Sequence, residues 1–159
     1  MERAPLPTRR CTTRGYAHMI EVSASPGRVW HALTDSPCVR LWSEQPADID
    51  ARKGGFYRFG TFPNGREAHV DVFDLDRRLR LIYLHSARMP ASGSAVVDDI
   101  LLDTRSEGRA TTLRVLGFGV PGSAQWDAAY ARMRQDWERW LARLKVAVEA
   151  ATRPAAPAS

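Results

Sequence analysis

The sequence lacks any apolar run close to the roughly 20 residues that a membrane-spanning helix needs. Its first 14 residues mix Pro, Thr and Arg, so they also lack the apolar segment of a secretory signal. We therefore expect a cytoplasmic protein without membrane insertion. The 159 residues are enough for one core and too few for two ordinary domains, which favours a single domain.

Cysteine is scarce as well. The two cysteines, Cys11 and Cys38, form no C-x-x-C motif, and no histidines pair at metal-ligand spacing. We expect two free thiols, no bound metal and no cofactor.

Lysine is almost absent: only Lys53 and Lys145 occur, although the net charge is +5. The positive charge is carried by arginines that are spread along the chain among acidic residues. A nucleic-acid site would need a basic helix or a basic cluster interleaved with aromatic residues, and neither is present. The sequence thus argues against a nucleic-acid partner.

The two ends of the chain differ in composition from the middle. Residues 1–16 and 151–159 are rich in Pro, Ala and Arg and show no periodicity, which predicts a flexible leader and a disordered tail. The folded domain is expected between them, over residues 17–150.

The middle of the chain begins with a strand and a helix and continues as strands. Ser25 followed by Pro26 is typical of a helix start and predicts a helix over 26–34, with a second short helical turn over 37–42. Strands separated by tight turns must pair antiparallel, because a parallel pair needs a long crossover. Alternating apolar residues predict strands at 18–22, 49–52, 56–59, 66–75, 80–85, 95–103 and 110–118.

The segment 123–150 predicts one long amphipathic helix. Its bulky apolar residues recur at spacings of three, four and seven, and a face of that size needs a sheet to cover it. The pattern predicts an α+β helix-grip fold, in which a curved antiparallel sheet wraps around the C-terminal helix. The residues of the apolar face are Trp126, Tyr130, Met133, Trp137, Leu141, Leu144 and Val148.

No stretch of the sequence carries a catalytic signature. The segment 117–122 matches G-x-G-x-x-G, but no strand follows the helix after it and Pro121 removes a backbone donor, which excludes a dinucleotide site. The serines form no nucleophile elbow, and neither cysteine has a histidine nearby in the sequence. We therefore predict no catalytic residues.

An acid–base pair would have to come from a few His and Asp residues on strands. The solvent face is the expected place for each of them. Asp98 and Asp99 are adjacent and must point to opposite faces, and an inward carboxylate would need a partner such as Arg114. The complete set is His18, His69, His85, Asp71, Asp98 and Asp99.

Several stretches, in order, resemble the START-like superfamily, in the branch related to the activator of Hsp90 ATPase. They are IEVSASP at 20–26 with VWHALTD at 29–35, the hairpin DARKGGFYRF at 50–59, and segments near 78–83, 111–119 and 137–144. The resemblance covers about 17–148 and implies the helix-grip fold. Gly117 stands where many relatives carry His, and Tyr83 where Trp is common. Related folds serve apolar ligand binding, cyclase or aromatase-like chemistry, stress-related roles and co-chaperone action.

The first functional hypothesis is a protein that binds an apolar or aromatic small molecule between the sheet and the last helix. The alternatives are a polyketide cyclase or aromatase-like enzyme and a chaperone-associated protein-binding module, and a homodimer suits all three. Trp42 is expected at the mouth of the cavity, and His85 and Asp98 as its polar groups. The predicted ligand-binding residues are Trp42, Tyr57, Phe59, Val70, Tyr83, His85, Asp98, Leu113, Val115, Met133 and Trp137.

Overall fold

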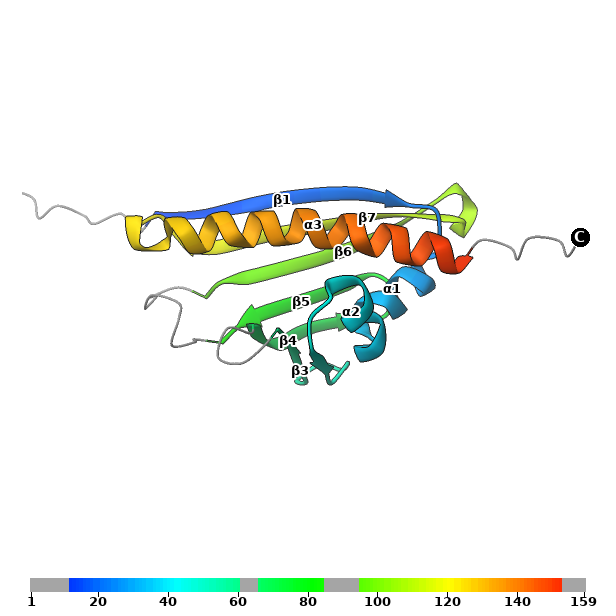
Figure 1. Cartoon of the computed structure of the whole chain (residues 1–159), viewed down its shortest axis with the longest axis horizontal. Helices are drawn as coiled ribbons and strands as arrows, with labels where there is room; N and C mark the ends of the chain where they lie inside the picture. Colours follow the sequence, from blue (N-terminus) through cyan, green and yellow to red (C-terminus); the bar gives the residue numbers. More distant parts are fainter. Residues whose placement is uncertain (1–11, 61–65, 85–94, 153–159) are drawn as a thin grey trace, which may run out of the picture.

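The chain folds into one curved antiparallel sheet with a long helix along one face, as the computed structural model of residues 12–60, 66–84 and 95–152 shows (Figure 1). The seven strands lie in the order β1-β7-β6-β5-β4-β3-β2, and each pairs antiparallel with its neighbours. The predicted helix-grip fold is confirmed. The strands are β1 (Thr13–Val22), β2 (Ala47–Ile49), β3 (Phe56–Phe59), β4 (Arg66–Asp74), β5 (Arg78–Tyr83), β6 (Val97–Arg105) and β7 (Ala110–Pro121).

Three α-helices and two single 3-10 turns complete the described structure. Helices α1 (Pro26–Thr34) and α2 (Ser36–Ser43) follow β1, and they lie beside the C-terminal end of α3 (Asp127–Thr152) (Figure 1). The 3-10 turns are η1 (Ser106–Gly108) and η2 (Ala124–Trp126). None of the helices in the described residues is long and apolar enough to cross a membrane.

The first strand begins earlier than the sequence predicts. Residues 13–16, expected within the flexible leader, belong to β1 and pair with the end of β7, where Thr13 lies opposite Pro121. The Arg14 guanidinium donates to the Pro121 carbonyl at 3.2 Å and to Asp127 at 2.7 Å. The reason is that β7 continues three residues past its expected end at Phe118. It therefore offers backbone hydrogen-bond partners to residues 13–16, whose sequence does not alternate between apolar and polar residues.

Other boundaries shift by a few residues. Strand β2 covers Ala47–Ile49 instead of 49–52, because the chain turns after Ile49 and Gly54 there adopts a φ of 81°. Strand β5 covers Arg78–Tyr83 instead of 80–85, and β6 covers Val97–Arg105 instead of 95–103. The last helix, α3, covers Asp127–Thr152 instead of 123–150 and follows the 3-10 turn η2.

The junction between α1 and α2 is held by side chains that replace missing backbone partners. Asp35 ends α1 and caps α2, where its side chain accepts from the Cys38 N–H at 3.2 Å. The Trp42 Nε1 donates to the Ala32 carbonyl at 2.8 Å, and the Tyr57 hydroxyl donates to the Leu33 carbonyl at 2.7 Å. These bonds fix both helices against each other and against β3.

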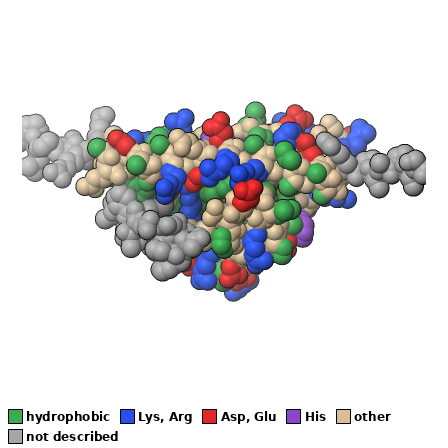
Figure 2. All heavy atoms as spheres, in the orientation of Figure 1, with side chains coloured by type: hydrophobic (Ala, Val, Ile, Leu, Met, Phe, Trp, Pro, Cys, Tyr) green, Lys and Arg blue, Asp and Glu red, His purple; other side chains and the backbone are tan. Residues whose placement is uncertain are grey.

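The core lies between the sheet and α3. The buried residues of α3 are Met133, Trp137, Trp140, Leu141, Leu144 and Val148. The Trp140 ring packs edge-on against Phe59 at 4.8 Å and against Trp137 at 5.5 Å between centroids. On the exposed side of α3, basic and acidic side chains are interspersed on the face that Figure 2 shows.

Candidate functional site

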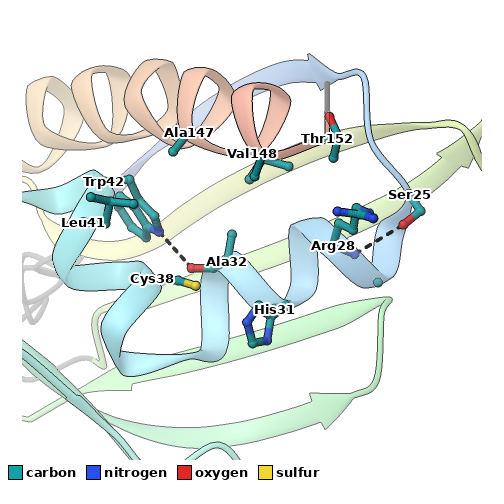
Figure 3. A pocket seen from close by; sticks show the side chains of 12 residues that line it. Ser25, Arg28, His31, Ala32, Cys38, Leu41, Trp42, Ala147, Val148 and Thr152 are labelled. Atoms are coloured by element: carbon teal, nitrogen blue, oxygen red, sulfur yellow. Dashed lines mark hydrogen bonds between the residues drawn. The ribbon is translucent and has the colours of Figure 1, made fainter. Parts of the chain in front are cut away.

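A pocket of about 380 Å³ lies between α1, α2 and the C-terminal end of α3 (Figure 3). Each helix contributes to its wall, because α1 and α2 run beneath α3 and leave a gap that their small residues do not fill. Most of the wall is apolar, which suits an apolar guest. The lining residues are Ser25, Gly27, Arg28, His31, Ala32, Cys38, Leu41, Trp42, Ala147, Val148, Ala151 and Thr152.

The two ends of the pocket differ in chemistry. Ser25, Arg28 and Thr152 lie at one end, and Leu41 and Trp42 lie at the other (Figure 3). Arg28 is exposed, whereas Trp42 is 3% exposed and held by its bond to the Ala32 carbonyl. The pocket thus offers an aromatic wall at one end and a cationic group at the other.

A second feature lies under α3, where Asp98 of β6 is completely buried. Its carboxylate accepts hydrogen bonds from the Tyr16 hydroxyl, from the Tyr83 hydroxyl at 2.6 Å and from the Trp137 Nε1 at 2.9 Å. The three donors come from β1, β5 and α3. Asp98 therefore ties the long helix to the centre of the sheet.

Burial dominates the electrostatics of this cluster. It raises the pKa of Asp98 above the ordinary value, although the three hydrogen bonds and the nearby Arg66 lower the pKa in part. Burial and the adjacent carboxylate also raise the pKa values of Tyr16 and Tyr83. The Arg66 guanidinium is bound to Asp136 at 2.7 Å and lies 5.0 Å from the centroid of the Trp140 ring.

Gly117 makes room for this cluster. It lies opposite Tyr16 in the β1–β7 pair, and a Cβ at this position would lie 2.1 Å from Cζ of the tyrosine ring. Real Cβ atoms do not approach a ring so closely. The absence of a side chain at Gly117 is therefore what allows the Tyr16 ring to lie over β7 and reach Asp98.

The sequence of the domain also matches a known family over most of its length. Residues 23–149 match the family described as Activator of Hsp90 ATPase homolog 1-like protein (AHSA1). The chain belongs to the AHSA1 family. A comparison with curated proteins finds no match.

Solved structures share the AHSA1 fold at low identity. Protein MLL2253 from Mesorhizobium loti is 18% identical with a TM-score of 0.74, covering 89% of this chain and 100% of that one. The Aha1 dimer from Colwellia psychrerythraea is 20% identical with a TM-score of 0.71, covering 88% and 99%. The Hsp90 activator PFC0360w from Plasmodium falciparum is 15% identical with a TM-score of 0.71, covering 84% and 95%. At these identities the likeness shows the fold alone.

Most of the residues predicted to bind a ligand lie in the core of this AHSA1 domain. Of the predicted ligand-binding residues that the structure describes, Trp42 alone lines the pocket between the helices. His85 lies outside the described residues. The others are buried between the sheet and α3: Tyr57, Phe59, Val70, Tyr83, Asp98, Leu113, Val115, Met133 and Trp137.

The adjacent aspartates point to opposite faces of β6, as predicted, but the expected partner of the inward one is wrong. Arg114 pairs with Asp103 at 2.9 Å, on the face away from α3, so it does not reach Asp98. Two tyrosines and a tryptophan partner Asp98 instead, because uncharged donors cost less to bury than a guanidinium. Asp99 accepts from Arg78 at 2.7 Å and from Arg80 at 3.2 Å.

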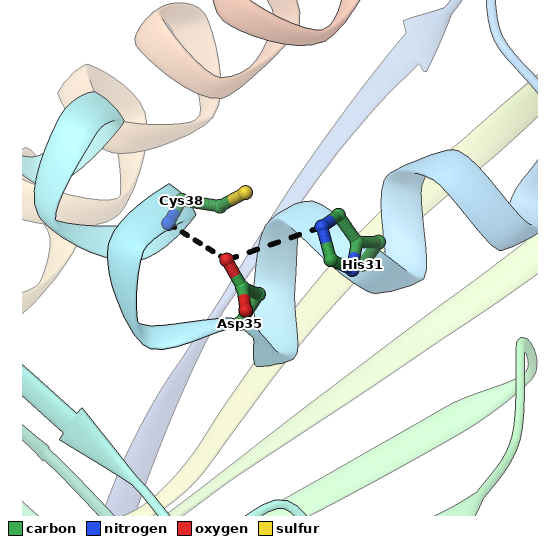
Figure 4. A group of neighbouring side chains, drawn as sticks. All are labelled: His31, Asp35 and Cys38. Atoms are coloured by element: carbon green, nitrogen blue, oxygen red, sulfur yellow. Dashed lines mark hydrogen bonds and ion pairs between the residues drawn. The ribbon is translucent and has the colours of Figure 1, made fainter.

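A cluster that was not predicted from the sequence lies at the junction of α1 and α2. His31, Asp35 and Cys38 place one nitrogen, one oxygen and one sulfur atom within 4.8 Å of one another (Figure 4). Burial and the Asp35 carboxylate raise the pKa of the Cys38 thiol to about 11, so the thiol is not activated as a nucleophile. The spacing of the three residues in the sequence could have indicated the cluster. Asp35 follows His31 by about one helical turn and lies three residues before Cys38, at the start of the next helix.

Proposed function

We propose that this protein binds a small molecule with an apolar or aromatic body in the pocket between α1, α2 and α3. The observation that carries the proposal is the pocket itself: about 380 Å³ of mostly apolar space, walled by three separate helices. That volume lies within the range of roughly 300–1,000 Å³ of small-molecule sites. Trp42 supplies a flat wall that suits a ring or a short alkyl chain.

Arg28 refines the class of ligand. Its guanidinium lies at the end of the pocket opposite Trp42, so a molecule with an apolar body and a carboxylate at one end matches both groups (Figure 3). We therefore favour an aromatic or medium-chain aliphatic carboxylate.

The sequence predicted a ligand site between the sheet and α3, deeper in the protein than the pocket between the helices. The described residues of that region pack against one another in a single hydrophobic cluster, and Asp98 has its partners from the protein itself. A ligand there would have to separate these contacts. The deeper site stays a prediction, and the packed side chains favour the pocket between the helices.

The proposal is tested with phenylbutyrate and decanoate in a thermal-shift titration. Ligand binding to the native state must raise Tm progressively with ligand concentration. Ala151→Phe places a large ring in the pocket wall and is expected to abolish the shift, whereas Ala150→Phe, on the exposed adjacent position of α3, is expected to keep it. An equal shift in both variants would contradict the proposal, as would no shift in the wild type.

The role of Arg28 has its own control. Arg28→Gln is expected to weaken phenylbutyrate binding by about tenfold and to leave the neutral analogue phenylbutanol unchanged, because only the carboxylate needs the charge. Arg132→Gln, at an exposed position of α3, is expected to change neither affinity. If Arg28→Gln weakened binding of phenylbutyrate and phenylbutanol equally, a carboxylate group would not be part of the proposed ligand class.

The AHSA1 family and its neighbours favour a second candidate, a protein-binding module that acts on a chaperone. Leu41, 72% exposed beside the pocket, would be an apolar contact for such a partner. Stimulation of Hsp90 ATP hydrolysis by the wild-type chain, lost in Leu41→Asp, would support it. A cyclase-type enzyme has less support, because its inward carboxylate, Asp98, is completely buried.

A further inference from the structure

Three metal-ligating side chains meet where α1 passes into α2. His31 lies in the last turn of α1, Asp35 lies between the helices and Cys38 lies in the first turn of α2. Their ligating atoms all lie within 4.8 Å of one another, and the three side chains converge on one side of the junction (Figure 4). The cluster belongs to neither the Asp98 network nor the hydrophobic core.

The backbone explains why the three side chains converge. Asp35 has an extended conformation with a φ of −90° and a ψ of 122°, which ends α1 and begins α2 within one residue. Its Oδ2 accepts from the Cys38 N–H and lies 3.9 Å from the Nε2 of His31. Capping thus aims the carboxylate between the imidazole and the thiol. The carboxylate also interacts with the Cys38 side chain, so all three groups already meet at Asp35.

The chemistry of the three donors is specific. Imidazole nitrogen, thiolate sulfur and carboxylate oxygen together suit zinc, whereas Mg²⁺ and Ca²⁺ prefer oxygen ligands alone. Zinc lies about 2.0–2.3 Å from such atoms, which places neighbouring ligands about 3.5 Å apart. Rotation of the side chains can bring the three ligating atoms from their present separations to about that distance. The His31 side chain is 68% exposed and free to turn.

We propose that His31, Asp35 and Cys38 form a zinc site. Three protein ligands leave the fourth position of a tetrahedral zinc ion open, as in sites where the metal also binds water or a small molecule. His31 and Cys38 also line the pocket between the helices, so the open position lies at the wall of that pocket. The metal site goes beyond the proposed binding function and does not depend on it.

Cobalt gives the first readout, because a cysteine thiolate bound to Co²⁺ produces a charge-transfer absorption that oxygen and nitrogen ligands do not. The experiment uses the full chain with Cys11→Ser, so that Cys38 is the only thiol. We expect one equivalent of Co²⁺ to produce the band and one equivalent of Zn²⁺ to displace it. Absence of the band would overturn the proposal.

Matched variants in the same background assign the ligands. His31→Ala and Cys38→Ser are each expected to weaken zinc binding, measured by competition with a chromophoric chelator, by at least about tenfold. Asp35→Asn keeps the cap on α2 but removes the charge, and it is expected to weaken zinc binding without lowering helicity. His69→Ala, at an exposed position on β4, is the control that should change nothing. Variants that bind zinc within about twofold of the parent would overturn the assignment.

The two proposals fail independently. Zinc and cobalt binding are measured without organic ligand, so the metal readouts do not depend on whether the pocket binds phenylbutyrate. Loss of metal binding with an intact phenylbutyrate shift would remove the zinc site alone. The reverse result would remove the proposed pocket function alone.

Discussion

At the scale of single residues, Asp98 is the most demanding group in the protein. A buried carboxylate is strongly disfavoured unless donors surround it, and here Tyr16, Tyr83 and Trp137 supply three. The sequence restricted the inward position to at most one of the two aspartates, and the expectation that these strand carboxylates face solvent is wrong for Asp98, which is completely buried. Its partners could not be read from the sequence, since they come from three elements far apart in the chain.

Replacement of Asp98 separates its charge from its hydrogen bonds. Asp98→Ala leaves three buried donors without an acceptor and is expected to lower the free energy of unfolding by about 3 kcal/mol or more. Asp98→Asn can still accept from Tyr83 and Trp137 and can donate to the Tyr16 oxygen, so its cost should be much smaller. Urea denaturation monitored by circular dichroism checks both, and equal losses would contradict the hydrogen-bond account.

The same residue predicts a pH dependence. Because the pKa of Asp98 is raised in the folded state, the native protein holds a proton that the unfolded chain releases, so stability falls as pH rises from about 4 through the folded pKa. Above the folded pKa the loss is constant. The difference in stability between wild type and Asp98→Asn should show this fall.

The pKa of Asp99 is shifted in the opposite direction, so its effect on stability has the opposite pH dependence. Burial alone would raise its pKa, but the bonds from Arg78 and Arg80 outweigh that effect and lower it. Its contribution is therefore present above about pH 4 and is lost as pH falls through the folded pKa. In a pH series of urea denaturation curves, Asp99→Asn should remove stability only above the folded pKa. A loss that grows as pH falls would contradict the account.

Gly117 and Gly27 should respond differently to substitution by alanine. Gly117→Ala drives a methyl group into the Tyr16 ring and is expected to cost about 1–3 kcal/mol, whereas Gly27→Ala on α1 meets nothing closer than 3.8 Å and should be neutral or stabilising by up to about 1 kcal/mol. Thermal unfolding checks both. When Tyr16 is replaced by Ala, the loss of stability caused by Gly117→Ala should become smaller. If the effects of the two substitutions on the free energy of unfolding simply add, the proposed contact is contradicted.

At the scale of elements, the junction of α1 and α2 depends on long-range capping. The start of α1 was evident from the sequence, because Ser25 followed by Pro26 is an ordinary start signal, and the helical turn predicted over 37–42 lies within α2. The predicted bounds of α1, 26–34, match the structure, but the groups that satisfy its last carbonyls were not predicted, since Trp42 and Tyr57 lie 10 and 24 residues from their acceptors. Such partners leave no local pattern.

Tyr57→Phe tests this capping directly. The ring stays in the core, but the Leu33 carbonyl loses its partner, so the free energy of unfolding should fall by about 1–2 kcal/mol. The matched control is Tyr130→Phe, whose hydroxyl bonds the Gly15 carbonyl at an exposed site and should cost less than about 0.5 kcal/mol. Equal costs in urea denaturation would contradict a structural role for the Tyr57 hydroxyl.

At the scale of the whole molecule, periodicity and turn signals predicted the architecture because a sheet and a covering helix each impose a repeat on the sequence. The seven strands and the long helix are present, and errors fell at strand ends, where polar residues such as Thr13 and Arg14 pair only because β7 extends far enough. The pocket could not be predicted, since it arises from three helices packing with small residues between them. The expected homodimer stays a prediction, in keeping with the dimeric Colwellia neighbour.

The central claim is that the ligand site lies between the helices and not under α3. It is tested most directly by titrating isotope-labelled protein with phenylbutyrate and following backbone amide chemical shifts. We predict the largest changes at 25–32, 38–42 and 147–152, with the amides of β5 and β6 nearly unmoved. Changes centred on Asp98, Tyr83 and Trp137 would contradict the account and return the ligand to the space between the sheet and α3.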